Sequence, residues 1–258
     1  MATKIVVGVW KDRLTVAQSA RVTHELVPRV QPGSTVLGVA PAPVAFTTVR
    51  RAAAGTPLEI VSHDVHWPAE SGSYIGTTSL AMLKELNVRY CMVGHSERRR
   101  FFCESNDDVL RKMLGCQQAS IIPILCVGDA EDDLHARQSV LTGQLAGSLR
   151  GEGSHNLDLR HVAIAYEPVW AISTWRSERP LPTGSEVRGM LELVREIARE
   201  VCAEDLPETP FLFGGSVGPA NAEEYFAEDG VDGALVGGAS LTADTLVTVF
   251  GAARAAWG

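Results

Sequence analysis

Eight short apolar runs alternate with longer segments of helical periodicity along this chain of 258 residues. The runs are rich in β-branched residues and almost continuously apolar, as expected for parallel strands that are covered on both faces. They lie at residues 4–9, 35–40, 58–63, 89–94, 121–128, 161–166, 210–214 and 232–237. Eight strand–helix units in roughly 250 residues predict an α/β fold, a (β/α)₈ barrel that forms a single domain over residues 1–258. A doubly wound sheet is the alternative, but no Gly-x-Gly-x-x-Gly motif follows the first run to support it.

The segments between the runs carry apolar residues at helical spacing. The clearest is 185–201, where one face consists of Val187, Met190, Leu191, Val194, Ile197 and Val201. A second stripe consists of Leu134, Leu141, Leu145 and Leu149. Ser105, with Asp108 three residues later, has the pattern of a helix N-cap. Spacing of three and four residues places such side chains on one face, so these segments are predicted to be amphipathic helices.

Charge and cysteine content restrict the class of protein. The net charge of −8 argues against a nucleic-acid partner, because such proteins generally need a basic face. The five cysteines are an odd number without a C-x-x-C pair, which favours reduced thiols over disulfides or a zinc site. No signal-peptide pattern and no apolar stretch near the ~18 residues of a membrane span are visible. We therefore expect a cytoplasmic protein with no membrane partner.

Reactive residues follow several of the predicted strands. Lys11 follows the first run, His95 and Glu97 the fourth, and Glu167 the sixth. Barrels carry their active sites at the carboxyl ends of the strands, so these side chains are expected to meet. Glycine-rich turns follow the seventh and eighth runs, at 214–218 and 237–241, and bare glycines let backbone N–H groups approach an anion.

This set of groups suits proton abstraction next to a carbonyl in a phosphorylated substrate. A carboxylate base would take the proton, while an imidazole and an ammonium group would stabilise the enediolate oxygens. The reaction needs no metal and no organic cofactor. A metal site at His63, Asp64 and His66 is not expected, since the two histidines would point to opposite faces of a strand.

Six motifs occur in an order that identifies a family. They are "WK", "MVGHSERR", "LCVGD", "AYEPVWAI", "FGGSV" and "VDGALVGGASL". With them, the sequence resembles the triosephosphate isomerase family over nearly its whole length. The resemblance implies a TIM barrel, a homodimer, and the interconversion of dihydroxyacetone phosphate and D-glyceraldehyde 3-phosphate in glycolysis and gluconeogenesis.

The resemblance also implies roles for single residues. Glu167 would be the base, His95 would polarise the carbonyl, Lys11 would stabilise negative charge, and Glu97 would orient its neighbours. Triosephosphate isomerase is itself the standard example of a Glu base beside a neutral His. The family's closing lid corresponds to residues 168–175. The predicted substrate- and phosphate-binding residues are Ser173, Gly215, Ser216, Leu235, Gly237 and Gly238.

The chain departs from the family at its dimer contacts. Val9 stands where the family has Asn, and the family's "TGE" is "IGT", Ile75 to Thr77. In the family that Thr binds the Asn of the other subunit, and the Glu pairs with the Arg that is Arg98 here. Both ends of the first contact have become apolar, and such a paired change can be nearly neutral. We expect the dimer to be kept, with Val9, Ile75, Thr77 and Arg98 at its interface.

Other departures leave the substrate open. Ser173 and Trp175 replace lid glycines, "SHDV" (62–65) replaces "AQNV", and "KDR" (11–13) replaces "KMN". Two alternatives therefore stand beside a triose phosphate isomerase. One is an isomerase of a related sugar such as a tetrulose (erythrulose) phosphate, and the other is a catalytically slack paralogue that binds a phosphorylated metabolite. We also expect Arg98 and Arg99 to pair with carboxylates, and Cys126 to be a buried packing thiol.

Overall fold

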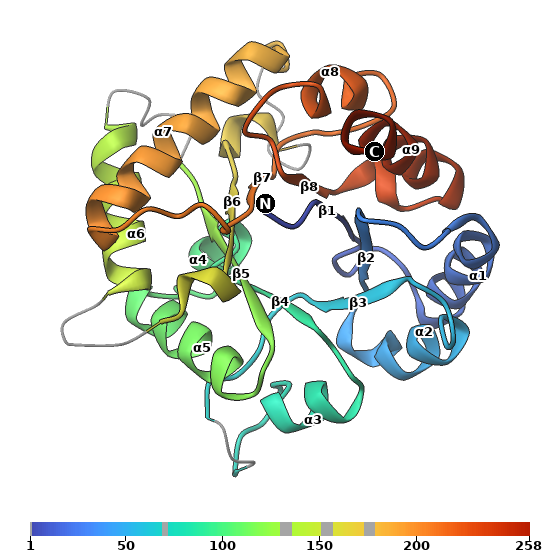
Figure 1. The fold of residues 1–258 in the computed structure, drawn as a ribbon. Coiled ribbons are helices and arrows are strands. Elements are labelled where there is room, and N and C mark those ends of the chain that lie inside the picture. The colour runs from blue at the N-terminus through green and yellow to red at the C-terminus, as the bar shows by residue number, and fades with distance from the viewer. Residues whose placement is uncertain (1, 69–71, 130–135, 151–156, 173–178) are drawn as a thin grey trace.

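The computed structural model describes residues 2–68, 72–129, 136–150, 157–172 and 179–258. Parallel strands form a closed barrel in which neighbours in sequence are neighbours in space, and β1 pairs with β8 (Figure 1). This confirms the predicted (β/α)₈ TIM barrel, and each predicted run contains one strand. The strands are β1 (Ile5–Val9), β2 (Val36–Ala40), β3 (Glu59–Ser62), β4 (Tyr90–Val93), β5 (Ile122–Val127), β6 (Ala163–Tyr166), β7 (Phe211–Phe213) and β8 (Gly233–Val236).

The α-helices form a layer around the barrel (Figure 1). They are α1 (Val16–Leu26), α2 (Phe46–Ala52), α3 (Leu80–Glu85), α4 (Ser96–Phe101), α5 (Asn106–Gln118), α6 (Arg137–Leu149), α7 (Gly184–Cys202), α8 (Ala222–Phe226) and α9 (Ala243–Trp257). Two short 3₁₀ helices matter for the site: η5 (Val169–Ala171) and η7 (Gly238–Ser240). No described helix has the length and apolar character needed to cross a membrane.

The helices begin and pack as their sequences predict. Ser105 caps α5 in a capping box with Asp108, which confirms that prediction. In α7, Val187 and Leu191 are buried as predicted, whereas Met190 is only half-buried at the edge of the apolar face. The stripe on α6 is buried at Leu141, Leu145 and Leu149, and Leu134 lies outside the described residues.

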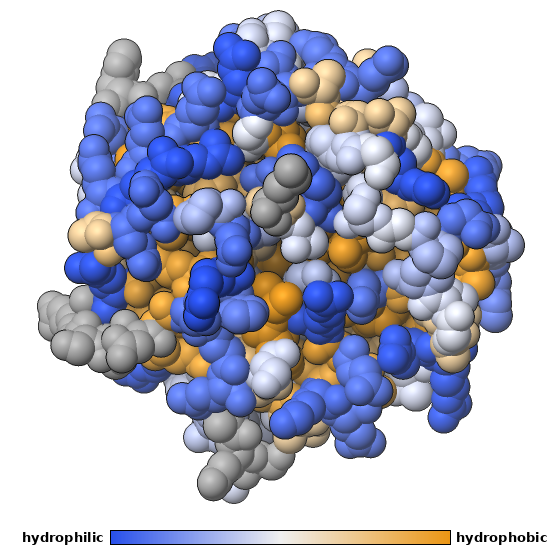
Figure 2. Space-filling view, viewed as in Figure 1, coloured by the Kyte–Doolittle hydropathy of each residue, from blue (hydrophilic) through white to orange (hydrophobic). Residues whose placement is uncertain are grey.

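Apolar side chains of the strands form two separate clusters. On β1, Val7 packs with the cluster inside the barrel, and Val6 packs with the larger cluster between the strands and the helices. Successive side chains of a strand point to opposite faces, and both faces are covered here. This explains why the runs are continuously apolar. In the space-filling view of Figure 2, hydrophilic residues cover most of the periphery, and hydrophobic residues are visible between them toward the middle.

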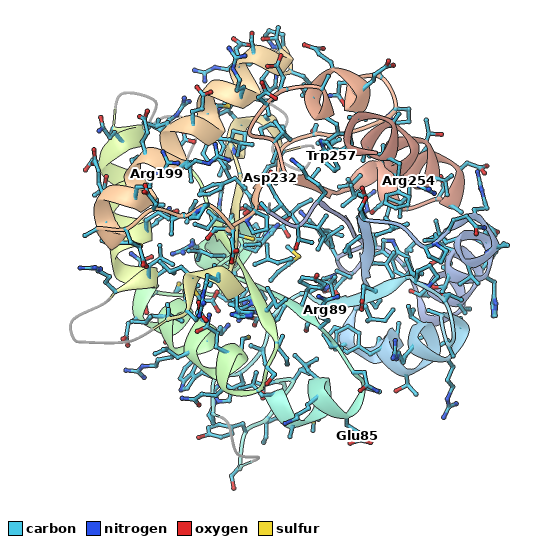
Figure 3. All side chains as sticks on the ribbon, in the orientation of Figure 1. Glu85, Arg89, Arg199, Asp232, Arg254 and Trp257 are labelled. Carbon is cyan, nitrogen blue, oxygen red and sulfur yellow. The ribbon has the colours of Figure 1, made fainter. Side chains whose placement is uncertain are left out.

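An ion pair and a hydrogen-bonded carboxylate connect the amino ends of β1 and β8. Lys4 lies 2.8 Å from Asp232 and within 5.0 Å of the Trp257 ring centroid, and Figure 3 labels the last two. Asp232 also accepts from the backbone N–H of Phe211 at 3.0 Å. These contacts close the barrel at the end opposite to the predicted site, so the carboxyl ends are free for chemistry.

Candidate active site

Two cavities at the carboxyl ends of the strands share Val9, Lys11 and His95 in their walls. The first cavity has a volume of about 130 Å³ and the second about 620 Å³. The first brings together most of the predicted site. It is lined by Lys11, His95 and Glu167 together with Gly215, Ser216, Leu235, Gly237 and Gly238. Glu97, Thr77 and Arg98 line the second cavity instead.

His95 caps the N-terminus of α4 and is held in a defined tautomer. Its Nδ1 accepts a hydrogen bond from the backbone N–H of Glu97 at 3.2 Å, so the ring hydrogen is assigned to Nε2. Nε2 lies 2.8 Å from Oε1 of Glu167 and donates to it. A ring that accepts at Nδ1 and donates at Nε2 is neutral, which is the form that can polarise a carbonyl.

Glu167 follows β6 and is buried in the wall of the first cavity. Its backbone N–H donates to Val127 at 2.7 Å, and its Oε2 accepts from the N–H of Ser96 at 2.9 Å. Burial alone would raise the pKa of this carboxyl, but His95, the Ser96 N–H and Lys11 together outweigh it and hold the pKa below its usual value. Glu167 is therefore a carboxylate at neutral pH, as a general base must be.

Lys11 reaches the site from a tight turn after β1. Its backbone has φ of 53°, a left-handed conformation that is costly for a residue with a side chain. Trp10 fixes the turn, because its backbone N–H donates to Ala40 and its indole N–H donates to Ser240, both at 3.0 Å. Lys11 Nζ lies 2.6 Å from Glu97 Oε1. Glu97 thus orients the ammonium group without lining the first cavity.

The glycine turns at Gly214–Gly215 and Gly237–Gly238 also line the first cavity. A Cβ built on Gly237 or Gly238 would have no neighbour within 4 Å, so the backbone there faces open space. Ser216 differs, since its hydroxyl and its N–H both donate to Ala171 of η5, at 2.7 and 2.9 Å. The predicted phosphate contact of Ser216 would therefore require these two bonds to be exchanged.

Comparison with known proteins identifies the family. The sequence model of triosephosphate isomerase matches residues 4–253. The chain belongs to the triosephosphate isomerase family. The triosephosphate isomerase of Thermoanaerobacter pseudethanolicus is 35% identical over 252 residues, which cover 96% of this chain and 99% of that protein. The triosephosphate isomerase of Geotalea uraniireducens is 34% identical over 256 residues, which cover 96% of this chain and 98% of that protein. That of Chlorobium phaeobacteroides is also 34% identical over 256 residues, which cover 98% of this chain and 100% of that protein.

Two of the residues predicted at the dimer interface, Val9 and Thr77, line the second cavity. Ile75 is 100% exposed, at the tip of the loop between β3 and α3, and Thr77 is exposed beside it. Val9 is buried between the two cavities. Within one chain Ile75 and Val9 therefore do not meet. Ser173 and Trp175 of the predicted lid lie outside the described residues.

A network of four charged residues lines the second cavity; it confirms that Arg98 pairs with carboxylates, while the part played by Lys112 was not predicted. Arg98 lies 2.9 Å from Asp64 and 3.3 Å from Glu104. Lys112 is buried and pairs with both carboxylates, 2.5 Å from Asp64 and in close contact with Glu104. The signals in the sequence are Asp64 in "SHDV" and the expected pairing of Arg98, and neither points to Glu104 or Lys112. The network gives Arg98 a carboxylate within its own chain, where the family's pattern supplies one from the partner.

Two further sequence expectations concern neighbouring side chains. The prediction that Arg99 pairs with a carboxylate is wrong, because its guanidinium donates to the carbonyl of Gly94, to Asn106 and to Ser148. Arg99 is half-buried, and these neutral acceptors satisfy the N–H groups of its guanidinium. Cys126 is buried, as predicted, and burial raises the pKa of its thiol well above the usual value.

His63 is a second unpredicted feature of this region. Its Nε2 lies 2.5 Å from the carbonyl of Ala40, and the ring lines the second cavity. Burial lowers the pKa of His63 to about 4, so the ring is neutral at physiological pH. Among the described residues, no group of three or more His, Cys, Asp or Glu side chains is arranged to hold a metal ion.

Proposed function

We propose that this protein is a triosephosphate isomerase that interconverts dihydroxyacetone phosphate and D-glyceraldehyde 3-phosphate. The observation that supports this best is the first cavity, where Glu167, His95 and Lys11 face the glycine turns at Gly237 and Gly238. A base, a neutral hydrogen-bond donor and a cation lie on one side and an anion-binding backbone on the other. This is the arrangement that an enediolate with a phosphate tail requires.

Glu167 would act as the base that moves a proton between two carbons. Its carboxylate takes a proton from C1 of dihydroxyacetone phosphate while the C2 carbonyl gains negative charge. The Nε2–H of His95 donates to the developing oxyanions and passes a proton between the two oxygens, and the Lys11 ammonium stabilises the charge. Glu167 then returns its proton to C2, which gives the aldehyde at C1 and leaves no net change in the enzyme.

Glu97 would position Lys11 in this reaction. The 2.6 Å bond between them fixes the ammonium group at the boundary of the two cavities. Binding energy at the phosphate would be used to align the reacting carbons. We assign Gly215, Ser216, Gly237 and Gly238 to the phosphate end and Leu235 to the apolar wall beside it. The family resemblance adds Ser173 and the lid.

We further propose that the protein is a homodimer in which the Ile75 loop of one copy enters the second cavity of the other. Apolar side chains are exposed around both features, with Tyr74 54%, Phe101 61% and Phe102 66% accessible. Phe102 lines the second cavity, and Val9 forms part of its inner wall. Covering these surfaces would stabilise a dimer through the hydrophobic effect. The five cysteines are all free, which supports a reduced, cytoplasmic setting.

A tetrulose phosphate is the second candidate substrate, and Val9 is the residue that favours it. Val9 replaces a polar amide beside Lys11, and it separates the small first cavity from the larger second one. An apolar wall at this point removes a hydrogen bond to a triose and changes the space next to the reacting carbons. Such a change alters the preference between substrates that differ by one carbon.

The test is the isomerase kcat/KM on D-glyceraldehyde 3-phosphate beside L-erythrulose 1-phosphate, with Glu167→Gln as the control. We expect a triose value toward the diffusional range of ~10⁸ M⁻¹s⁻¹. The variant should lose at least about 10³-fold in kcat while it still binds phosphate. A low kcat/KM on the triose phosphate together with a high kcat/KM on the tetrulose phosphate would favour the second candidate substrate. Failure on both, with phosphate still bound, would indicate the catalytically slack paralogue.

A further inference from the structure

Arg13 stands at the end of the turn that carries Lys11, and this turn is fixed against the glycine-rich wall. The backbone N–H of Arg13 donates to the carbonyl of Trp10 at 3.2 Å and closes the turn. Trp10 is fully buried and its indole N–H binds Ser240, which belongs to the same 3₁₀ turn as Gly238. The position of Arg13 relative to the glycine turn is therefore set by the fold.

Three consecutive side chains of this turn are divided between the two cavities. Asp12 lines the second cavity, Arg13 lines the first, and Lys11 lines both. Arg13 shares the wall of the first cavity with Ser216, Gly237 and Gly238, the residues assigned to phosphate. Arg13 thus belongs to the wall of the cavity that would hold the anionic end of the substrate.

Among the described residues around the first cavity, every charged side chain that could pair with Arg13 already has another partner. Lys11 is paired with Glu97 at 2.6 Å, and Glu167 is bound by His95 and Ser96. The Arg13 side chain has no ion pair and no hydrogen bond with any residue in the described part of the chain. It is exposed at the rim. An unpaired cation beside an anion cradle adds attraction for an anion that the glycine backbone alone does not supply.

We propose that Arg13 is a further substrate-binding residue, whose guanidinium contacts the phosphate group held by the Gly237–Gly238 turn. This rests on the proposed function and extends it, since it makes the site select a phosphomonoester dianion by charge as well as by shape. A guanidinium can bind two phosphate oxygens at once, and such charge-assisted bonds are stronger than neutral ones. The backbone N–H groups would fix the position of the phosphate, and Arg13 would neutralise part of its charge of about −1.5 to −2.

The test measures the binding of inorganic phosphate by calorimetry and the kinetics on D-glyceraldehyde 3-phosphate for wild type, Arg13→Gln and Arg13→Lys. The control is Arg21→Gln, which removes the same charge from the nearby helix α1, outside both cavities. We expect Arg13→Gln to weaken phosphate binding and raise KM about tenfold, the size of one charge-assisted hydrogen bond at an accessible site. The kcat of Arg13→Gln should stay within about twofold of the wild-type value, because the reacting carbons lie at the end of the substrate away from the phosphate.

The lysine variant and the salt dependence make the result specific. Arg13→Lys should retain most of the phosphate affinity, and raising the ionic strength should weaken phosphate binding less in Arg13→Gln than in wild type. The melting temperature should be unchanged, since Arg13 supports no other described residue. Unchanged phosphate affinity in Arg13→Gln, or an equal loss in Arg21→Gln, would overturn the proposal. If wild type binds phosphate through Arg13 but does not turn over the triose, the proposed function fails and this inference stands.

Discussion

Nε2 of His95 lies 2.8 Å from Oε1 of Glu167, and Nδ1 of the same ring accepts from the N–H of Glu97. The expected electrophile and the expected base are therefore hydrogen-bonded to each other before substrate arrives. The bond fixes the tautomer of the ring and keeps the buried carboxyl ionised. A substrate carbonyl must take over this Nε2–H, so binding would free the Glu167 carboxylate to act on carbon.

The variant His95→Asn tests this relationship. Its amide is too short to reach Glu167, so the favourable interaction that offsets burial is lost and the pKa of Glu167 should rise. The acid limb of the kcat/KM profile should then move to higher pH than in wild type. kcat itself should fall about 10²- to 10³-fold, the usual effect of removing one donor to an oxyanion.

The pH profile separates this role from simple packing. A substrate phosphate also titrates near pH ~6, so wild type and variant must be compared on the same substrate. An acid limb that does not move in His95→Asn, despite a large loss of kcat, would mean that His95 does not control the ionisation of Glu167.

His63 predicts a pH dependence of stability. In the unfolded chain this ring takes up a proton near pH 6.5, and in the folded protein only near pH 4. Between these values the unfolded state binds more protons, so the free energy of unfolding should fall as the pH falls from about 6.5 to about 4. The loss should be at most about 3.5 kcal/mol, since the two pKa values differ by about 2.5 units and each unit contributes about 1.4 kcal/mol.

The matched control is His63→Gln, whose amide can still donate to the Ala40 carbonyl and cannot titrate. Urea denaturation at several pH values should give a flatter profile between pH 4 and 6.5 for this variant than for wild type. Parallel profiles for the two proteins would show that His63 is not the group responsible.

Lys112 predicts a large loss of stability from a single substitution. It is buried between Asp64 and Glu104, and Lys112→Met would leave those two carboxylates with Arg98 as their cation. Removing one member of a buried charge network costs about 3–5 kcal/mol, and here two carboxylates would be left with a single cation. Denaturation of the variant should show this decrease.

Arg111→Met is the control for this experiment, since it removes a neighbouring cation from the same helix. Arg111 is paired with Asp107 on the exposed face of α5, and exposed pairs contribute about 0–1 kcal/mol. Similar losses for the two variants would indicate a general effect of charge on α5 and would contradict the buried network.

The positions of the strands and of the three reactive side chains could be predicted from sequence for one physical reason. Residues that follow buried parallel strands must emerge at the same end of a barrel. The placement of Lys11, His95 and Glu167 could therefore be predicted without knowledge of tertiary contacts. Their meeting in one cavity confirms that placement. Their chemical roles remain predictions that kinetic experiments can test.

The charge network and the partner of Arg99 could not be predicted in the same way. Asp64 follows β3, whereas Arg98 and Lys112 lie on α4 and α5 after β4, and only the packing of α5 against the site brings Lys112 to the other two. Arg99 is in the same motif as Arg98, yet it turns to neutral acceptors beside α5 and α6. Partners of long side chains depend on packing details that a pattern of residues does not contain.

Val9 and Ile75 give a prediction about the proposed dimer. If Ile75 of one copy packs on Val9 of the other, Val9→Asn alone would bury an amide without a partner and weaken the dimer by about 1–3 kcal/mol. Ile75→Thr alone would bury an unpaired hydroxyl at a similar cost.

The double variant should recover most of the loss, because the amide and the hydroxyl can bind each other. Sedimentation equilibrium gives the dissociation constants for this cycle, and a favourable coupling of about 1 kcal/mol or more is expected. Costs that simply add would place the two residues apart, and the apolar exposure of Ile75 would then need another explanation.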